Sequence, residues 1–356
     1  MTGGIVGPMS RALQELFGID EPIVLGPFGG LSSVELTAGV SELGGLGSYG
    51  LYGYSPERIH DAVMQLRAAT DRPFAVNVWL PTGDEVTPSE VDLAPFTAAL
   101  KPLFDAVGAE PPAAPTAFLP DIRDQLAAVL EAAPAVLSVV FGVPQPWLVS
   151  AARARGIRVV GTATSVAEAR LLDEAGVDAI VATGAEAAGH RVSFLRRPED
   201  SLVGTFALVP QVVDAVGVPV IAAGGVADRR GVAAAFALGA SGVQVGTAFL
   251  RTRESAATEG HRRAICEAGD TDTVLTRAMS GRLARGIPNR ALRQIETSGL
   301  IAPFPAQNWL TGVFRAAAAR SGDADLLSLW AGQASALAVR DSAADVFAEL
   351  RAGVPR

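Results

Sequence analysis

The 356 residues of this chain are too many for one small domain, and they fit a barrel of about 250 residues with a smaller appended region. The formal net charge is −8 and no basic stripe is present, which argues against partners such as nucleic acid or a membrane surface. The single cysteine, Cys266, excludes an intrachain disulfide and a cysteine metal framework, and we expect no metal. Met1 to Phe17 do not have the pattern of a signal peptide, and no apolar run reaches about 18 residues, so we expect a cytoplasmic protein.

Eight short apolar runs recur along the chain, each followed by a glycine or proline turn and an alanine-rich amphipathic helix. The runs are continuous rather than alternating, which is typical of a parallel sheet covered by helices. The last four units recur every ~20 to 40 residues, and no GxGxxG turn follows the first run. The pattern therefore favours a (β/α)₈ barrel over an open Rossmann sheet. The predicted strands are Ile23–Leu25, Leu46–Tyr49, Phe74–Val78, Val136–Phe141, Ile157–Gly161, Ala179–Ala182, Val218–Ala223 and Gly242–Val245.

Two segments depart from this pattern. Residues 81–134 form a long insertion rich in proline and alanine, and after Arg251 no further strand run is visible. We therefore predict an α/β protein with a barrel at residues 16–252, which includes the insertion, and a smaller, mainly helical cap at residues 253–356. The insertion and the cap are expected to cover the barrel mouth. The helices expected in these two segments are Phe96–Val107, Ile122–Ala132, Arg253–Ala268, Trp309–Ala319, Asp323–Ser335 and Ala343–Leu350.

The residues that follow the last two strands give the strongest chemical signal. In a (β/α)₈ barrel the site lies at the carboxyl ends of the strands. Gly224 and Gly225 follow the seventh predicted strand, and Gly246 and Thr247 follow the eighth. Glycine lets the backbone approach a ligand closely, and adjacent backbone N–H groups bind anions. The two turns together predict a phosphate site, although each glycine alone is explained equally well by a tight turn.

Polar residues at the other strand ends are further candidates. His190 follows the flexible Gly189 after the sixth strand, and an imidazole that titrates near neutral pH exchanges protons with a substrate. Asn77 and Gln244 interrupt apolar strands, where an amide either bonds to the backbone or faces a ligand. Glu186 either orients His190 or is solvated, and we favour solvation.

Three stretches together resemble one family. Residues 184–191 read Gly-Ala-Glu-Ala-Ala-Gly-His-Arg, residues 219–226 read Pro-Val-Ile-Ala-Ala-Gly-Gly-Val, and residues 242–247 read Gly-Val-Gln-Val-Gly-Thr. They resemble the nitronate monooxygenases, formerly called 2-nitropropane dioxygenases. The segments 22–30 and 74–79 are also similar to that family, as is Ser280-Gly281-Arg282. The resemblance extends from about Leu16 to Gly332.

The resemblance implies non-covalently bound FMN, with the family histidine at His190 as the catalytic residue. It implies a substrate pocket that includes Phe28 and Ser280. Three positions depart from the common family pattern: Phe28 replaces a methionine, Ala188 a glycine and Thr183 a glutamine. These departures bear on the substrate more than on the cofactor. The positions expected to contact FMN are Gly26, Pro27, Asn77, Thr183, Ala188, Gly189, Gly224, Gly225, Gln244, Val245, Gly246 and Thr247.

The function implied by the resemblance is the FMN-dependent oxidation of nitronates or nitroalkanes with O₂. His190 would act as a base for a neutral nitroalkane or, when protonated, would stabilise the anion. One alternative is an NAD(P)H-dependent FMN enzyme that reduces activated alkenes such as enoyl thioesters, because such a family shares the barrel and the Gly-His loop. Another is a non-catalytic barrel that binds a phosphorylated metabolite. The oligomeric state is left open, with a homodimer as one option.

Overall fold

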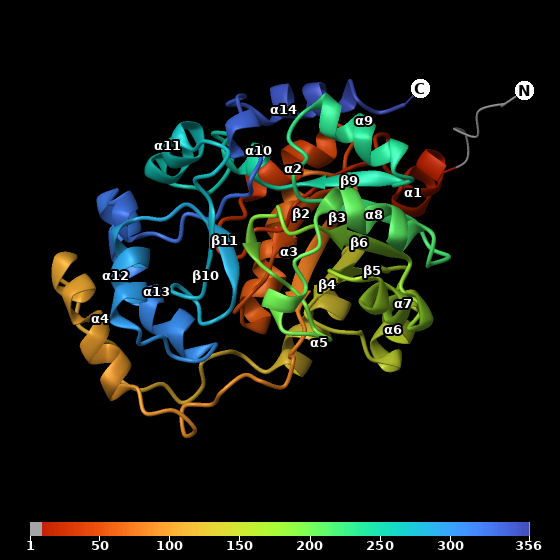
Figure 1. Ribbon diagram of the computed structural model, residues 1–356. Coiled ribbons are helices and arrows are strands. Elements are labelled where there is room, and N and C mark those ends of the chain that lie inside the picture. Colours follow the sequence, from red (N-terminus) through yellow and green to blue (C-terminus); the bar gives the residue numbers. More distant parts are fainter. Residues whose placement is uncertain (1–8, 356) are drawn as a thin grey trace, which may run out of the picture.

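A computed structural model describes residues 9–355, and its centre is a barrel of eight parallel strands (Figure 1). The strands follow one another in the sheet in the order β1-β9-β8-β6-β5-β4-β3-β2. A parallel bridge between Val24 and Leu46 joins the two ends of this order and closes the barrel. All eight predicted strands and the predicted fold class are confirmed. The strands are β1 (Ile23–Leu25), β2 (Gly47–Gly50), β3 (Phe74–Trp79), β4 (Val136–Val140), β5 (Arg158–Ala163), β6 (Ala179–Thr183), β8 (Val220–Ala223) and β9 (Gly242–Val245).

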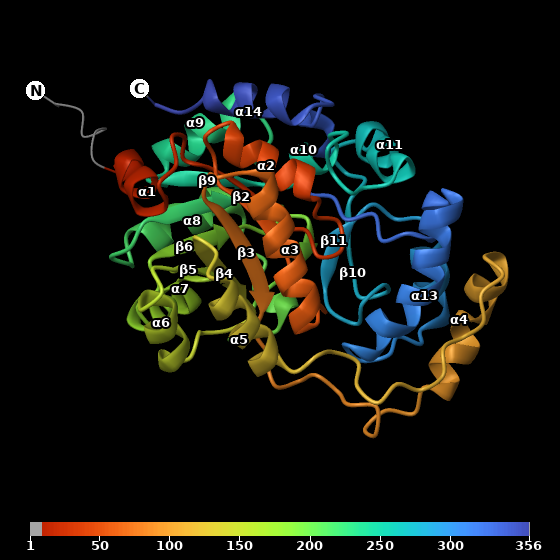
Figure 2. The same cartoon turned by 180° about the vertical axis from the view of Figure 1, so that it is seen from behind.

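Amphipathic helices surround the barrel (Figures 1 and 2). Side-chain caps fix where several of them begin: Ser55 accepts a hydrogen bond from the backbone of Arg58, and Asp228 accepts one from Arg230. The N-terminal end of the barrel is closed by helix α1, because Leu13 packs with the residues of the barrel interior. The helices are α1 (Met9–Phe17), α2 (Val34–Glu42), α3 (Pro56–Ala69), α5 (Ile122–Ala132), α6 (Pro146–Arg153), α7 (Val166–Glu174), α8 (Thr205–Val213) and α9 (Arg229–Ala237).

The cap has a hydrophobic core of its own, which includes Phe104, Leu310 and Phe314. Helix α4, from the insertion, packs there against helices of the C-terminal region (Figure 1). The last helix, α14 (Ala343–Arg351), instead packs on the barrel helices α2 and α9. The other helices of the cap and its borders are α4 (Ala94–Ala106), α10 (Thr247–Leu250), α11 (Glu259–Glu267), α12 (Arg290–Ser298) and α13 (Ala306–Ser321), and the 3₁₀ turns are η1 (Pro198–Asp200), η2 (Ala324–Leu326) and η3 (Ser335–Leu337).

The expectation that no strand follows Arg251 is wrong. Strands β10 (Val274–Thr276) and β11 (Ala284–Gly286) pair antiparallel, and β11 also pairs with β7 (Gly189–His190). Each of these strands contains a glycine or a polar residue, so none leaves the continuous apolar run of a barrel strand. Their pairing is tertiary, because β7 comes from the barrel and β11 from the cap.

The predicted helix at Asp323–Ser335 is also wrong. That segment holds the turn η2, an extended Trp330 that bridges to Gly286, and the start of η3. The backbone carbonyl of Trp330 lies 3.0 Å from Nε2 of His261, so it accepts from a side chain and not from the backbone of a helical turn. Leu326, Leu327 and Leu329 of this segment are buried in the cap core.

The described residues contain neither a membrane-spanning helix nor a cluster of metal-ligating side chains. Within residues 9–355, no helix combines the length and apolar character that crossing a bilayer requires. The same residues contain no group of three or more histidine, cysteine, aspartate or glutamate side chains placed to hold a metal ion.

Candidate functional site

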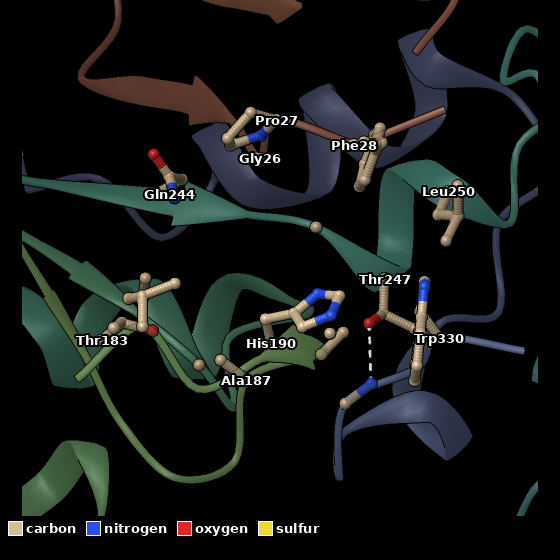
Figure 3. A pocket seen from close by; sticks show the side chains of 18 of the residues that line it. Gly26, Pro27, Phe28, Thr183, Ala187, His190, Gln244, Thr247, Leu250 and Trp330 are labelled. Atoms are coloured by element: carbon tan, nitrogen blue, oxygen red, sulfur yellow. Dashed lines mark hydrogen bonds between the residues drawn. The ribbon is translucent and has the colours of Figure 1, made fainter. Parts of the chain in front are cut away.

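A cavity of about 370 Å³ lies at the carboxyl ends of the barrel strands, under the cap (Figure 3). This volume is within the ~300–1,000 Å³ typical of small-molecule and cofactor sites. Its wall brings together residues from the ends of β1, β3, β4, β5, β6, β8 and β9 and from the cap, as expected for the site of a (β/α)₈ barrel. The predicted site residues that line it are Gly26, Pro27, Phe28, Asn77, Thr183, Ala188, Gly189, His190, Gly224, Gly225, Gln244, Gly246 and Thr247.

The backbone conformation requires glycine in the turn after β8. Gly224 and Gly225 have φ values of 97° and 75°, in the left-handed region that other residues rarely adopt. The turn after β9 lies close to the turn after β1, because a Cβ built on Gly26 would lie 3.1 Å from Gly246 Cα, whereas a Cβ on Gly246 itself would meet only Phe28 Cε1, at 3.6 Å. Thr247 Oγ1 accepts a hydrogen bond from Gly332 N at 3.0 Å, which leaves the hydroxyl hydrogen free to donate. The turns therefore expose backbone and one hydroxyl donor to the cavity.

Asn77 is buried at the end of β3, with Nδ2 bonded to the neighbouring strand at Ser138 Oγ (3.1 Å). This bond fixes the amide, and the side chain still borders the cavity. Arg191, beside His190, is buried and donates to the Thr183 carbonyl at 2.6 Å. That bond ties the His190 segment to the end of β6.

His190 is held by the cap as well as by the barrel. Its backbone pairs with Ala284 of β11, and its Nε2 lies 2.8 Å from Ser280 Oγ. Burial, together with the smaller effect of the nearby cations Arg282 and Arg315, lowers the pKa of His190 to about 3. The imidazole is therefore neutral at pH 7, and the expected titration near neutral pH is absent because the site disfavours a positive charge there.

Two predicted site residues do not border the cavity. Ser280 is buried behind the imidazole of His190, so it contacts the histidine rather than the space where a ligand fits. Val245 is buried, and its side chain belongs to the hydrophobic core around the barrel.

Glu186 has neither of the two roles that the sequence suggested. Its carboxylate accepts hydrogen bonds from Thr205 N at 2.9 Å and from Thr205 Oγ1 at 2.9 Å. It therefore caps the first turn of α8 and is half-buried at the cavity wall. The sequence could not show this role because Thr205 lies 19 residues away.

Sequence reasoning missed the aromatic residues of the barrel mouth and most of the wall that the cap supplies. The ring of Trp79 is tilted against Tyr52 (4.3 Å between centroids) and meets His190 edge-on (4.8 Å). Arg315 is a charged residue on the side of α13 that lines the cavity. A charge at that position of the predicted helix was a sequence signal that could have predicted a residue of the site. The residues that complete the wall and were not predicted include Tyr52, Trp79, Glu186, Phe304, Asn308, Arg315, Trp330 and Gly332.

Comparison with known proteins places this geometry in a known group. A family model described as "Nitronate monooxygenase" matches residues 10–353. Proteins described as "Probable nitronate monooxygenase" from Staphylococcus aureus strains Newman and MRSA252 are 40% identical over 341 residues, which covers 95% of this chain and 95% of each relative.

Solved structures give the same result. A nitroalkane oxidase from Streptomyces ansochromogenes is 36% identical, with a TM-score of 0.84 and coverage of 95% of this chain and 96% of that one. FabK from Thermotoga maritima is 30% identical, with a TM-score of 0.75 and coverage of 95% and 94%.

Proposed function

Because the chain belongs to the nitronate monooxygenase family, we propose that its cavity binds FMN and that the enzyme uses it to oxidise nitronates with O₂. The observation that carries the proposal is the cavity itself. It combines two glycine turns at adjacent strand ends, the amide of Asn77 and the imidazole of His190 in one wall. The family is flavin-dependent, and the chain is an oxidoreductase of this family.

The residues present fit the phosphate of FMN. The backbone of Gly224–Gly225 and of Gly246 borders the cavity without side chains, and Thr247 has a free hydroxyl hydrogen. A Cβ on Gly224 would lie 3.1 Å from Ala187 N, so a side chain there would also crowd the loop that carries His190. We propose Asn77, Gln244 and Thr183 as contacts to the rest of the cofactor. When bound, FMN supplies the redox chemistry of the reaction.

His190 would act through its Nδ1 atom. Ser280 Oγ lies 3.1 Å from the Arg282 carbonyl, to which its hydroxyl donates. Ser280 Oγ then accepts from Nε2–H of His190, which leaves the Nδ1 lone pair without a protein partner among residues 9–355. A neutral imidazole in this form accepts a hydrogen bond or a proton at Nδ1, and its low pKa makes it a weak base. The pocket therefore favours a substrate that arrives already deprotonated.

An absorbance spectrum and two anaerobic mixing experiments test the proposal. The purified protein should be yellow, and heat release should yield FMN rather than FAD. Anaerobic mixing with propane-2-nitronate should bleach the flavin absorbance, and the aerobic enzyme should consume O₂ with the same substrate. NADH without nitronate should leave the flavin oxidised.

The alternative activities give different results in the same experiments. Rapid bleaching by NADH alone, with turnover of an enoyl thioester and none of a nitronate, would replace the proposal with the NAD(P)H-dependent reductase. A colourless protein that takes up no FMN would favour a non-catalytic phosphate-binding barrel.

A further inference from the structure

The guanidinium of Arg315 is the cation in the cavity wall that no carboxylate neutralises. Its partners are neutral oxygens: Ser328 Oγ at 3.0 Å, and the carbonyl and Oδ1 of Asn308 at 3.0 and 2.8 Å. Its Nε has no hydrogen-bond partner in the described part of the chain, and no ion pair there involves it. A buried charge is costly unless it is paired, so a ligand that supplies the opposite charge would bind here favourably.

The other charges near the cavity are already engaged. Arg282 donates to Asp84 and Glu85, at 2.6 Å in each case. Glu186 caps α8 through Thr205. His190 is neutral at pH 7. Arg191 and Arg285 are also bonded only to neutral oxygens, but neither lines the cavity. Among the residues that line it, Arg315 is therefore the cation left to attract an anion.

Asn308 holds a second donor beside Arg315. Its Nδ2 donates to the hydroxyl oxygen of Tyr52 at 3.2 Å, while its Oδ1 accepts from Arg315. Tyr52 therefore keeps its own hydroxyl hydrogen free to donate. Burial raises the pKa of Tyr52 to about 12, so that hydrogen is present at any physiological pH. One amide thus fixes two donors that both line the cavity.

This pair of donors lies on the same side of the cavity as His190. The Tyr52 ring contacts the Trp79 ring in a tilted arrangement, 4.3 Å between centroids, and the same Trp79 ring meets His190 at 4.8 Å. The glycine turns after β8 and β9 come from other strand ends. The donors are therefore placed at the reacting end of the cavity and not in the proposed phosphate site.

We propose that Arg315 and Tyr52, held by Asn308, form an anion subsite that binds the nitronate group, so that the enzyme selects the nitronate anion over the neutral nitroalkane. The proposal rests on the function proposed above. It deepens that function by naming the ionisation state of the substrate and the residues that recognise it. A guanidinium suits this task because it stays charged at pH 7 in a buried site, where a lysine ammonium loses its proton more readily.

A redox-inert pair of ligands tests binding apart from turnover. Isobutyrate has the same branched arrangement of heavy atoms as propane-2-nitronate and also carries a planar two-oxygen anion, and isobutyramide is its neutral counterpart. Titration of the FMN-loaded protein with each, followed by flavin absorbance and calorimetry, gives two dissociation constants. The wild type should bind isobutyrate at least about tenfold more tightly than isobutyramide, as expected for a hydrogen bond to a charged group.

Three variants separate charge from folding. Arg315→Met should weaken isobutyrate binding roughly 10- to 100-fold and leave isobutyramide within about threefold. Asn308→Asp should have the same effect with Arg315 in place, because its carboxylate would accept from both Arg315 and Tyr52 and neutralise the site from within. Arg320→Met removes the same charge from an exposed position on α13 and should change neither constant. FMN content and melting temperature show whether each variant is folded.

The outcomes distinguish this proposal from the proposed function. Isobutyrate binding that is unchanged in both Arg315→Met and Asn308→Asp, or an equal loss for acid and amide, would overturn the anion subsite. Under turnover, Arg315→Met should raise the KM for nitronate more than it lowers kcat. If the wild type does not oxidise nitronates but binds isobutyrate through Arg315, the function fails and the subsite stands.

Discussion

The imidazole of His190 and the hydroxyl of Ser280 meet at 2.8 Å, although 90 residues separate them in the chain. His190 comes from the loop after β6 and Ser280 from the segment between β10 and β11. The cap therefore does more than cover the barrel. It supplies the strand that pairs with His190 and the hydroxyl that sets which imidazole nitrogen is free.

We expect Ser280→Ala to reduce kcat/KM for a neutral nitroalkane about tenfold, since it removes one hydrogen bond that orients the imidazole. His190→Ala should reduce it by at least as much. The double variant should lose little more than His190→Ala alone, because the hydroxyl acts through the histidine. Steady-state kinetics on the FMN-loaded variants measure this, and fully additive losses would show that Ser280 acts independently. Ser321→Ala, at the end of α13, is the control and should leave the rate unchanged.

Gly225→Ala should lower the affinity for FMN by more than its effect on the stability of the fold accounts for. Gly225 has a φ of 75°, and a Cβ there meets its nearest atom, in Glu186, at 3.7 Å, so the cost to the fold is backbone strain of about 1–2 kcal/mol. Gly299 has a similar φ of 67° and open space around it, at the end of α12. Gly299→Ala should therefore show the same loss of stability and retain the affinity of the wild type for FMN. Fluorescence titration of apoprotein with FMN measures the difference, and equal affinities in the two variants would exclude Gly225 from the phosphate site.

Glu85→Gln should loosen the start of the insertion. Arg282 donates to both Asp84 and Glu85, and its guanidinium lies 3.9 Å over the Phe304 ring. Glu85 is the less exposed of the two carboxylates, 19% against 73%, so its charge is less screened by solvent. We expect a loss of roughly 1–3 kcal/mol in the free energy of unfolding.

The pair Arg277–Glu199, which is 41% exposed on both sides, provides the matched comparison for this prediction. Glu199→Gln should cost about 0–1 kcal/mol, as surface ion pairs do. Urea unfolding gives both values, and limited proteolysis should cut residues 82–93 faster only in Glu85→Gln. Similar losses in the two variants would show that the Arg282 contacts add nothing beyond a surface pair.

The barrel could be predicted from the sequence because each strand is buried on both faces. Such a strand leaves a continuous apolar run, as in Ile23–Leu25, whose predicted bounds equal the observed ones. The glycine turns could be placed as well, because they directly follow the carboxyl ends of such strands. Strands β7, β10 and β11 leave no such run, since each contains a glycine or a polar residue and is stabilised by pairing between distant segments.

The chemistry of the site was only partly predictable for a related reason. His190 stands in a recognisable motif, but its low pKa depends on burial under the cap and on Arg282 and Arg315. Glu186 looked like a solvated loop residue because its partner, Thr205, begins a different helix. The protonation state and burial of a side chain depend on neighbours that only the fold brings together. A sequence motif can therefore identify the residue without predicting its pKa or its hydrogen-bond partners.

His261 should make the protein less stable in mild acid. It is 2% exposed, its Nε2 lies 3.0 Å from the Trp330 carbonyl, and burial lowers its pKa to about 4. Between pH 6.5 and 4 the unfolded chain therefore binds a proton that the folded chain does not, so stability is full above about pH 6.5 and falls as the pH falls. The expected loss from pH 7.5 to pH 5 is roughly 1–2 kcal/mol from this residue. Burial lowers the pKa of His190 in the same direction, so part of the acid sensitivity should remain in any His261 variant.

His261→Gln isolates this contribution, since an amide can donate to the same carbonyl and does not titrate. The variant should lose less stability than the wild type between pH 7.5 and pH 5, measured as the urea midpoint at each pH with FMN content held constant. His60→Gln is the control, because His60 is 39% exposed on α3 and pairs with the surface residue Glu131. If His261→Gln and His60→Gln follow the same pH dependence as the wild type, the buried histidine under Trp330 does not govern the acid response. If His261→Gln alone flattens it, protonation of His261 is what loosens the cap segment that carries Trp330 into the cavity wall.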